Sequence, residues 1–156
     1  MSLYFLKNSS KIISNFSKYI ANTIEVLRLL DTDANPNAMD RYGYTPLHAA
    51  NTPEIVDLLL NAGPDINHPN QFGDTPLRIA VADRHPKLEC IKELLRQGAD
   101  KDIQDAKGKT SLEAVQDAIE FGIVDSSRST STKIDNNARK VYAGVLELFF
   151  FPKHLW

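Results

Sequence analysis

The sequence lacks the features that mark several large classes of protein. Its 156 residues contain a single cysteine, Cys90, so an internal disulfide is excluded and a reducing compartment is favoured. No apolar run approaches the roughly 18–20 residues that span a bilayer. The apolar group at residues 3–6 is too short for the core of a secretory signal. We therefore expect a cytoplasmic protein, and delivery into a host cell by another route stays open.

An excess of charge of one sign is also lacking. The formal net charge is −2, which gives no case for the concentrated basic face of a nucleic-acid-binding protein. The glycines are spread along the chain and are not gathered in a phosphate-binding loop. The four histidines share no ligand spacing with the cysteine, whereas a zinc site usually needs four ligands. We expect no metal, no cofactor and no nucleic-acid partner.

The sequence does contain one short pattern in three copies, at 43–50, 73–80 and, more weakly, 108–114. In each copy a glycine permits a tight turn, and a threonine can accept a hydrogen bond from the first N–H groups of a helix. In the first two copies a proline follows at the first helical position, where its missing N–H costs nothing. The pattern predicts a turn that leads directly into a helix, repeated every 30 to 35 residues.

Apolar residues at helical spacing predict a second helix after each of these turn-and-helix units. Gly63 and Gly98 are placed to terminate two of these second helices in the left-handed conformation. Two less regular helices are expected before the first pattern, the second of them burying Ile24, Leu27, Leu29 and Leu30. The predicted helices lie at about 11–20, 23–31, 46–50, 53–60, 76–83, 88–95, 111–122 and 136–150.

These repeats resemble the ankyrin family. The resemblance is carried by Gly43-x-Thr45-Pro46-Leu47-His48-x-Ala50, by Gly73-x-Thr75-Pro76-Leu77-x-x-Ala80, and by the helix ends at 59–67 and 94–100. It implies an all-α repeat fold, an α-solenoid of about four repeats. Each repeat is a helix-turn-helix with a projecting turn or β-hairpin finger, and degenerate repeats cap both ends. Arg78 and Glu113 depart from the family pattern, which usually has a histidine that ties neighbouring repeats together.

The expected organisation is one ankyrin-repeat domain over residues 1–156. Within it we place a degenerate N-terminal repeat at 1–39, a second repeat at 40–69 and a third at 70–103. The C-terminal repeat covers 104–156 and carries a Ser/Thr-rich insertion at 123–135.

The resemblance implies a non-catalytic protein–protein interaction module, which binds a partner protein on the concave face of its fingers and first helices. Aromatic and arginine side chains are enriched in binding hot spots. The alternative is that Tyr42 and Phe72 only pack on the adjacent finger. The candidate partner-binding residues are Arg41, Tyr42, Tyr44, Gln71, Phe72, Asp74, Lys107 and Lys109.

Two residues could suggest an enzyme. His48 follows Thr-Pro-Leu and is expected to hydrogen-bond an adjacent turn rather than to act in catalysis. Cys90 lies on the apolar stripe of its helix, so a buried and inert core thiol is favoured over a nucleophile. We therefore expect no enzymatic activity.

The aromatic C-terminus leaves two alternatives open. It either caps the open end of the stack or forms an apolar docking patch, because large exposed apolar patches are usually functional. In the second case the protein is a self-associating structural module, a homodimer through Phe149, Phe150, Phe151 and Trp156. A third hypothesis is a microbial effector that acts on a host protein.

Overall fold

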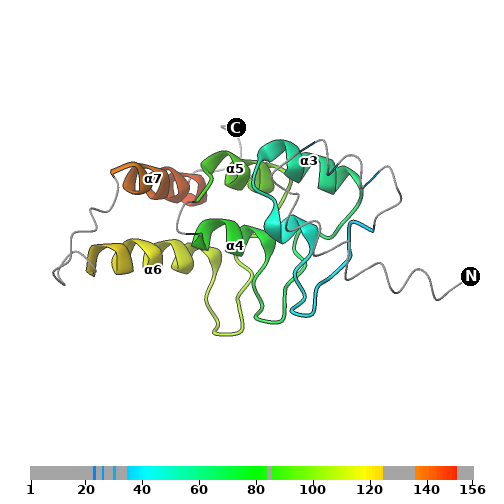
Figure 1. Cartoon of the computed structure of the whole chain (residues 1–156). Helices are drawn as coiled ribbons and strands as arrows, with labels where there is room; N and C mark the ends of the chain where they lie inside the picture. The colour runs from blue at the N-terminus through cyan, green and yellow to red at the C-terminus, as the bar shows by residue number, and fades with distance from the viewer. Residues whose placement is uncertain are drawn as a thin grey trace, which may run out of the picture.

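The helices lie in two layers. The computed structural model describes Thr23, Val26, Leu30 and residues 35–83, 86–124 and 136–150. One layer contains the 3-10 helix η1 (Pro46–Ala49), α4 (Pro76–Ala82) and α6 (Ser111–Val124), and the other contains α3 (Pro53–Asn61), α5 (Leu88–Arg96) and α7 (Asn136–Phe150) (Figure 1). Neighbours within each layer pack side by side. These residues contain no β-strand, which confirms the predicted all-α repeat stack.

Helices α4 and α6 of the first layer begin as the threonine pattern predicts. Thr75 Oγ1 accepts a hydrogen bond from the Arg78 N–H at 3.2 Å, and Pro76 follows at the first helical position. In α6 the capping is reciprocal, since Thr110 Oγ1 accepts from the Glu113 N–H and Glu113 Oε2 accepts from the Thr110 N–H at 2.7 Å. Such caps each stabilise a helix by about 1 kcal/mol, which matters most for segments this short.

The second-layer helices are bounded by equally local signals. Thr52 Oγ1 accepts a hydrogen bond from the Ile55 N–H at 3.3 Å at the start of α3. The predicted glycine terminators are confirmed, because Gly63 has a φ of 86° and Gly98 a φ of 97°. These are left-handed backbone conformations that glycine adopts without steric cost. The lengths of both helices therefore follow from residues at their ends.

The hydrophobic core fills the space between the two layers. Every described helix of the two layers contributes to it, with the fully buried side chains Leu47, Ile55, Leu59, Leu77, Ile91, Leu94, Val115 and Val145. Cys90 is buried in this core and its thiol donates to the Ala50 carbonyl at 3.5 Å. The predicted core position of Cys90 is confirmed, and burial raises the pKa of its thiol to about 11.

Three turns project from the first layer, on the side away from α3, α5 and α7 (Figure 1). We call these turns, residues 40–44, 70–74 and 105–109, the finger row. Each is closed at its base by one backbone hydrogen bond, which joins Asp40 N to Tyr44 O, Asn70 N to Asp74 O, and Asp105 N to Lys109 O, at 2.9–3.0 Å. The fingers are thus tight turns rather than strands of a β-hairpin.

Neighbouring fingers are joined through their backbones. Gln71 N–H donates to Tyr42 O at 3.0 Å, and Ala106 N–H donates to Phe72 O at 2.9 Å. This close approach needs glycine at the preceding turn. A Cβ at Gly43 would lie 3.1 Å from Gln71 N, and a Cβ at Gly73 would lie 2.6 Å from Ala106 N. The finger row is therefore one hydrogen-bonded unit.

Two expectations need correction. Helix α6 continues through Gly122 to Val124, so residues 123 and 124 are helical and do not belong to the Ser/Thr-rich insertion. Glycine weakens a helix by only about 1 kcal/mol, which the flanking turns can offset. Val26, absent from the predicted apolar stripe, is fully buried. The helix expected at about 11–20, residues Ile24, Leu27 and Leu29, and the rest of the insertion lie outside the described residues.

Two glycines of the finger row provide a matched test. Both Gly73 and Gly108 have a positive φ, 78° and 76°, at which alanine costs about 1–2 kcal/mol. Only at Gly73 would the new Cβ also collide with the next finger, whereas at Gly108 no described atom lies within 4 Å. We expect Gly73→Ala to lower the free energy of unfolding by a further 1–3 kcal/mol or so compared with Gly108→Ala. Urea denaturation followed by circular dichroism measures the difference, and equal losses would contradict the stacked fingers.

Candidate functional site

The predicted partner-binding residues divide into exposed and half-buried side chains. Tyr42 and Phe72 occupy equivalent positions in neighbouring fingers and are 40% and 49% exposed. Arg41, Gln71 and Lys107 are also exposed, whereas Tyr44, Asp74 and Lys109 are half-buried. The structure thus brings all eight residues into the finger row, where five are exposed and the side chain of Lys109, 43% exposed, also reaches solvent.

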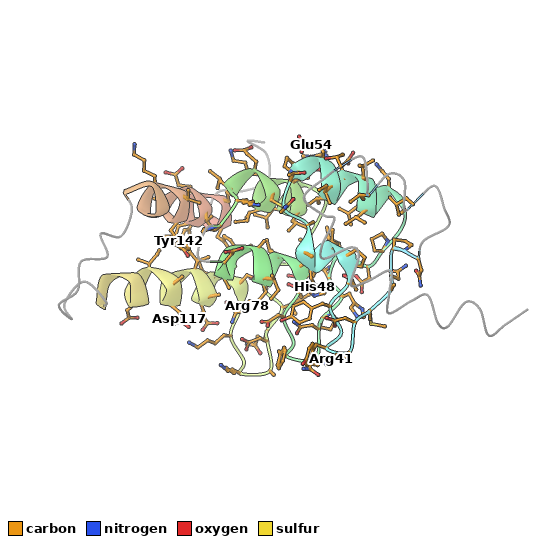
Figure 2. All side chains as sticks on the ribbon, in the orientation of Figure 1. Arg41, His48, Glu54, Arg78, Asp117 and Tyr142 are labelled. Carbon is orange, nitrogen blue, oxygen red and sulfur yellow. The ribbon has the colours of Figure 1, made fainter. Side chains whose placement is uncertain are left out.

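Arg41 and Tyr42 form a local pair at the first finger. The guanidinium carbon of Arg41 lies 4.6 Å from the centre of the Tyr42 ring, a cation–π contact. Arg41 lies at the tip of its finger, away from the helices, whereas His48 and Arg78 lie in the first-layer helices η1 and α4 (Figure 2). The contact orders an arginine and an aromatic ring together at a position where a partner can reach both.

Tyr44 differs from Tyr42 because it packs inward. Its ring meets the ring of His48 edge to face, with the centroids 5.5 Å apart. Burial, together with the carboxylates of Asp74 and Asp40, raises the pKa of Tyr44. Tyr44 therefore supports the finger through its contact with His48, so its replacement would disturb the stability of the stack.

The half-buried charges of the row are paired with one another. Arg78 lies 2.6 Å from Asp105 and 3.7 Å from Asp74, and its side chain is 12% exposed. Burial alone would raise the pKa of Asp105, but Arg78 and the backbone N–H groups of Lys109 and Lys107 lower it to about 2. Lys109 forms an ion pair with Asp117 of α6. Arg78 therefore ties the second finger's helix to the third finger.

His48 ties the second repeat, residues 40–69, to the third, residues 70–103. The Thr45 N–H donates to His48 Nδ1 at 3.0 Å, so Nδ1 is the acceptor and the proton resides on Nε2. Nε2 then donates to the Asp74 carbonyl at 3.0 Å. Burial, the largest effect, lowers the pKa of His48 although the Asp74 hydrogen bond acts in the opposite direction. Both ring nitrogens are occupied, which confirms the structural role and leaves no free base for catalysis.

The described residues form no cluster of metal-ligating side chains. Among them no group of three or more histidine, cysteine, aspartate or glutamate side chains could hold a metal ion. Nor does any helix within those ranges have the length and apolar character needed to cross a membrane.

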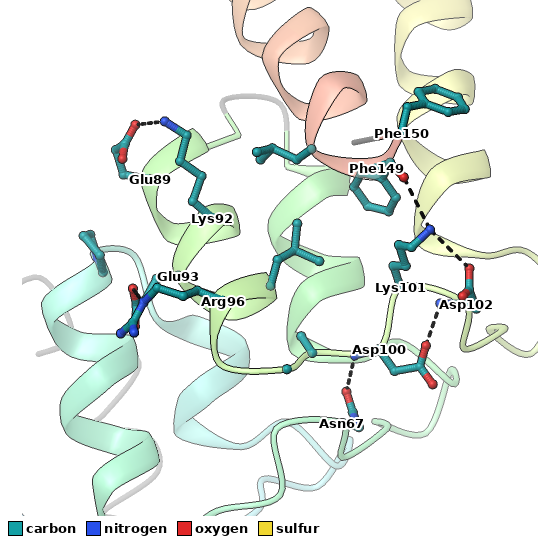
Figure 3. A pocket seen from close by; sticks show the side chains of 15 residues that line it. Asn67, Glu89, Lys92, Glu93, Arg96, Asp100, Lys101, Asp102, Phe149 and Phe150 are labelled. Atoms are coloured by element: carbon teal, nitrogen blue, oxygen red, sulfur yellow. Dashed lines mark hydrogen bonds and ion pairs between the residues drawn. The ribbon is translucent and has the colours of Figure 1, made fainter. Parts of the chain in front are cut away.

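A second surface lies at the other side of the stack, where α5, the turn after it and the end of α7 border a groove of about 980 Å³ (Figure 3). Its charges largely satisfy one another, since Lys92 lies 2.8 Å from Glu89 and Arg96 lies 2.5 Å from Glu93. Lys101 Nζ donates to the Phe149 carbonyl at 3.4 Å, at the C-terminal end of α7 where a cation is favoured.

The aromatic C-terminus is split between core and surface. Phe149 is 5% exposed and packs in the core beside Val145 and Leu148, so it is not available for the predicted homodimer. Phe150, one residue further, is 67% exposed at the rim of the groove. Phe151 and Trp156 lie outside the described residues. The end of α7 therefore covers the stack with one face and leaves one aromatic ring in solvent.

The sequence analysis missed two residues in or beside the finger row, Met39 and Asp105. Met39 is exposed beside the first finger, and its sulfur lies 3.1 Å from Nε2 of His68. Asp105 is not among the predicted residues, although it is the carboxylate that Arg78 binds. Its spacing of 27 residues from Arg78 was the available signal, because His48 reaches the next repeat over 26 residues.

Stacked helix pairs with a row of turns along one side define a solenoid repeat protein. A family model described as ankyrin repeats (3 copies) matches residues 49–126, half of the chain. The chain belongs to the ankyrin-repeat family. Repeats of this family generally mediate protein–protein interaction and are typically non-enzymatic.

Several curated proteins are similar over the same region. An ankyrin repeat-containing protein of Schizosaccharomyces pombe is 35% identical over 100 residues, 62% of this chain and 46% of that protein. Ankyrin repeat and SOCS box protein 6 of Mus musculus is 39% identical over 89 residues, 54% of this chain and 21% of that protein. The E3 ubiquitin-protein ligase KEG of Arabidopsis thaliana is 36% identical over 94 residues, 58% of this chain and 6% of the ligase. The chain thus spans less than half the length of each of these relatives.

The buried His48 predicts a pH dependence of stability. Its pKa is lowered in the folded protein, so the unfolded chain takes up a proton first as the pH falls below about 6.5. The stabilisation is complete above this pH and decreases below it, with a slope of at most about 1.4 kcal/mol per pH unit. Urea denaturation between pH 7.5 and 5 measures it in the wild type and in His48→Gln. The decrease should be steeper in the wild type, and parallel curves would show that His48 contributes nothing to it.

Proposed function

We propose that the finger row, together with the exposed faces of η1, α4 and α6, binds a partner protein without catalysing a reaction. The observation that carries this proposal is the exposure of Tyr42 and Phe72 at equivalent positions of two hydrogen-bonded fingers. Exposed large apolar side chains held on a rigid frame are typical of binding surfaces. Membership of a family whose repeats generally mediate protein–protein interaction supports it.

Each finger contains some residues that contact the stack and others that are exposed, and this separation also supports the proposal. The residues that build the turn point inward, including Gly43, Thr45 and His48, whose contacts are all within the stack. The exposed side chains make no such contact with the stack, so their identity can be set by a partner. These are Arg41, Tyr42, Gln71, Phe72 and Lys107.

The test compares partner capture by the wild type and by a Tyr42→Ser/Phe72→Ser variant, using extracts of the source cells and quantitative mass spectrometry. Because both side chains are exposed, the thermal midpoint should hardly change. Affinity for a captured partner should fall at least about 30-fold, the usual effect of a hot spot worth 2 kcal/mol or more. A Glu89→Ala/Lys92→Ala variant, altered on the opposite layer, is the matched control. Retention of the same partners by the Tyr42/Phe72 variant would remove the finger row from the function.

A second candidate function is self-association through Phe150. Its support is the exposure of this aromatic ring beside the groove formed by α5 and α7. In this reading two copies bury their Phe150 side chains against each other's groove, and the finger row stays free.

Light scattering of the wild type at several concentrations tests this second candidate. If the proposal holds, the mass should rise from monomer toward dimer with concentration, and Phe150→Ser should keep the protein monomeric because the lost contact is apolar. Circular dichroism checks that the variant is folded. A wild type that stays monomeric at the highest concentration would argue against the homodimer.

A further inference from the structure

The exposed charges of the finger row are all positive. Arg41 at the first finger and Lys107 at the third finger are exposed, and neither side chain is paired with a carboxylate among the described residues. Tyr42 and Phe72 lie in the fingers between these two cations. The row therefore presents cation, ring, ring and cation in sequence along one hydrogen-bonded edge.

The acidic side chains of the row are half-buried and make their contacts within it. Asp40 Oδ1 accepts hydrogen bonds from the N–H groups of Tyr42 and Tyr44, at 2.8 and 2.9 Å. Asp105 Oδ1 likewise accepts from Lys107 and Lys109, at 2.8 and 2.9 Å. Asp74 and Asp105 also face Arg78. Among the described residues these carboxylates thus form no ion pair with Arg41 or Lys107.

The stacking geometry shows what could extend the row. The carbonyl of the third residue of a finger accepts a hydrogen bond from the N–H of the second residue of the following finger. The two such bonds are Gln71 N–H to Tyr42 O and Ala106 N–H to Phe72 O. Lys107 holds the equivalent position in the last finger, and the space beside Gly108 contains no described atom within 4 Å. The last finger accordingly has an open edge.

A second copy of the chain is a poor match for that edge. Its first finger would bring Arg41, the second residue of that finger, against Lys107, and two cations at such a distance repel each other. A negatively charged segment beside Lys107 would be attracted rather than repelled. The charge pattern thus selects against head-to-tail association and for an anionic partner.

We propose that the finger row recognises an acidic segment of a partner protein, in which carboxylates meet Arg41 and Lys107 and an apolar side chain packs between Tyr42 and Phe72. This inference rests on the proposed function, since it names the chemistry of the partner at the same surface. Charges at the rim of an interface chiefly raise the association rate and are screened by salt. Removing Arg41 or Lys107 should therefore weaken binding about 2- to 5-fold each at low salt.

The probe is a library of random 12-residue peptides displayed on phage and selected on the immobilised full chain. Enrichment of peptides that combine aspartate or glutamate with an aromatic or aliphatic residue is the expected result. A selected peptide is then synthesised with a fluorophore, and its affinity is measured by anisotropy at 50 and 300 mM NaCl. Binding should weaken with salt and should weaken further when its carboxylates are replaced by amides.

Variants assign the binding to the finger row. Arg41→Gln/Lys107→Gln should lower the affinity for the acidic peptide about 4- to 25-fold, the product of the two single effects. Lys87→Gln/Lys140→Gln removes two exposed cations from the second layer and should leave the affinity unchanged. Equal losses in the two double variants would mean that net charge, rather than the row, attracts the peptide, and would overturn the inference.

The outcomes separate this inference from the proposed function. Selected peptides without acidic residues, whose binding is still lost in Tyr42→Ser/Phe72→Ser, would overturn the acidic partner and leave the binding surface in place. Failure of the wild type to enrich any peptide would count against both. A third outcome is self-association that increases with concentration, is strengthened by Lys107→Glu and is abolished by Arg41→Glu/Lys107→Glu. This outcome would assign the open edge to a second copy of the chain and would also overturn the inference.

Discussion

The structure depends on a carboxylate or amide oxygen at the first residue of each finger. Asp40, Asn70 and Asp105 each accept two backbone N–H groups from their own turn, at 2.8–3.0 Å. This contact closes the turn, and the glycine at its fourth residue then adopts a positive φ. Once the turn is closed, its third carbonyl points toward the next finger and its second and third side chains point to solvent. A short polar side chain thus determines both the stacking and the display of the tips.

The coupling between repeats is achieved by different chemistry at equivalent positions. His48 donates to a backbone carbonyl of the next finger, whereas Arg78 forms an ion pair with the carboxylate that also closes the next finger. Glu113, the third member of the series, bonds only to Thr110 in its own repeat. Glu113 lies in α6, which follows the last finger, and the described residues contain no further finger for it to contact. The departures from the family pattern therefore follow the position of each repeat in the stack.

The same inward pairing shapes the recognition surface. Because Asp40, Asp74 and Asp105 are occupied by backbone N–H groups or by Arg78, the exposed tips keep only cations, rings and neutral side chains. The opposite layer shows the contrary arrangement, in which exposed charges pair along α5 and leave Phe150 as the conspicuous apolar group. The two sides of one stack thus expose different side chains, with unpaired cations and aromatic rings on the fingers and paired charges along α5.

Much of this protein could be predicted from local sequence, because a helix start needs only a threonine, a proline and the next three residues. The turns, the caps at Thr75 and Thr110 and the extent of α7 were determined in this way. Other features depended on residues far apart in the chain. Gly122 did not end α6, Phe149 was buried while Phe150 stayed exposed, and Tyr44 turned toward His48. The sequence pattern does not distinguish these neighbouring residues. Only the packing of one repeat on the next decides which side chains are covered, because burial depends on the segment that packs against a residue and not on the residue type alone.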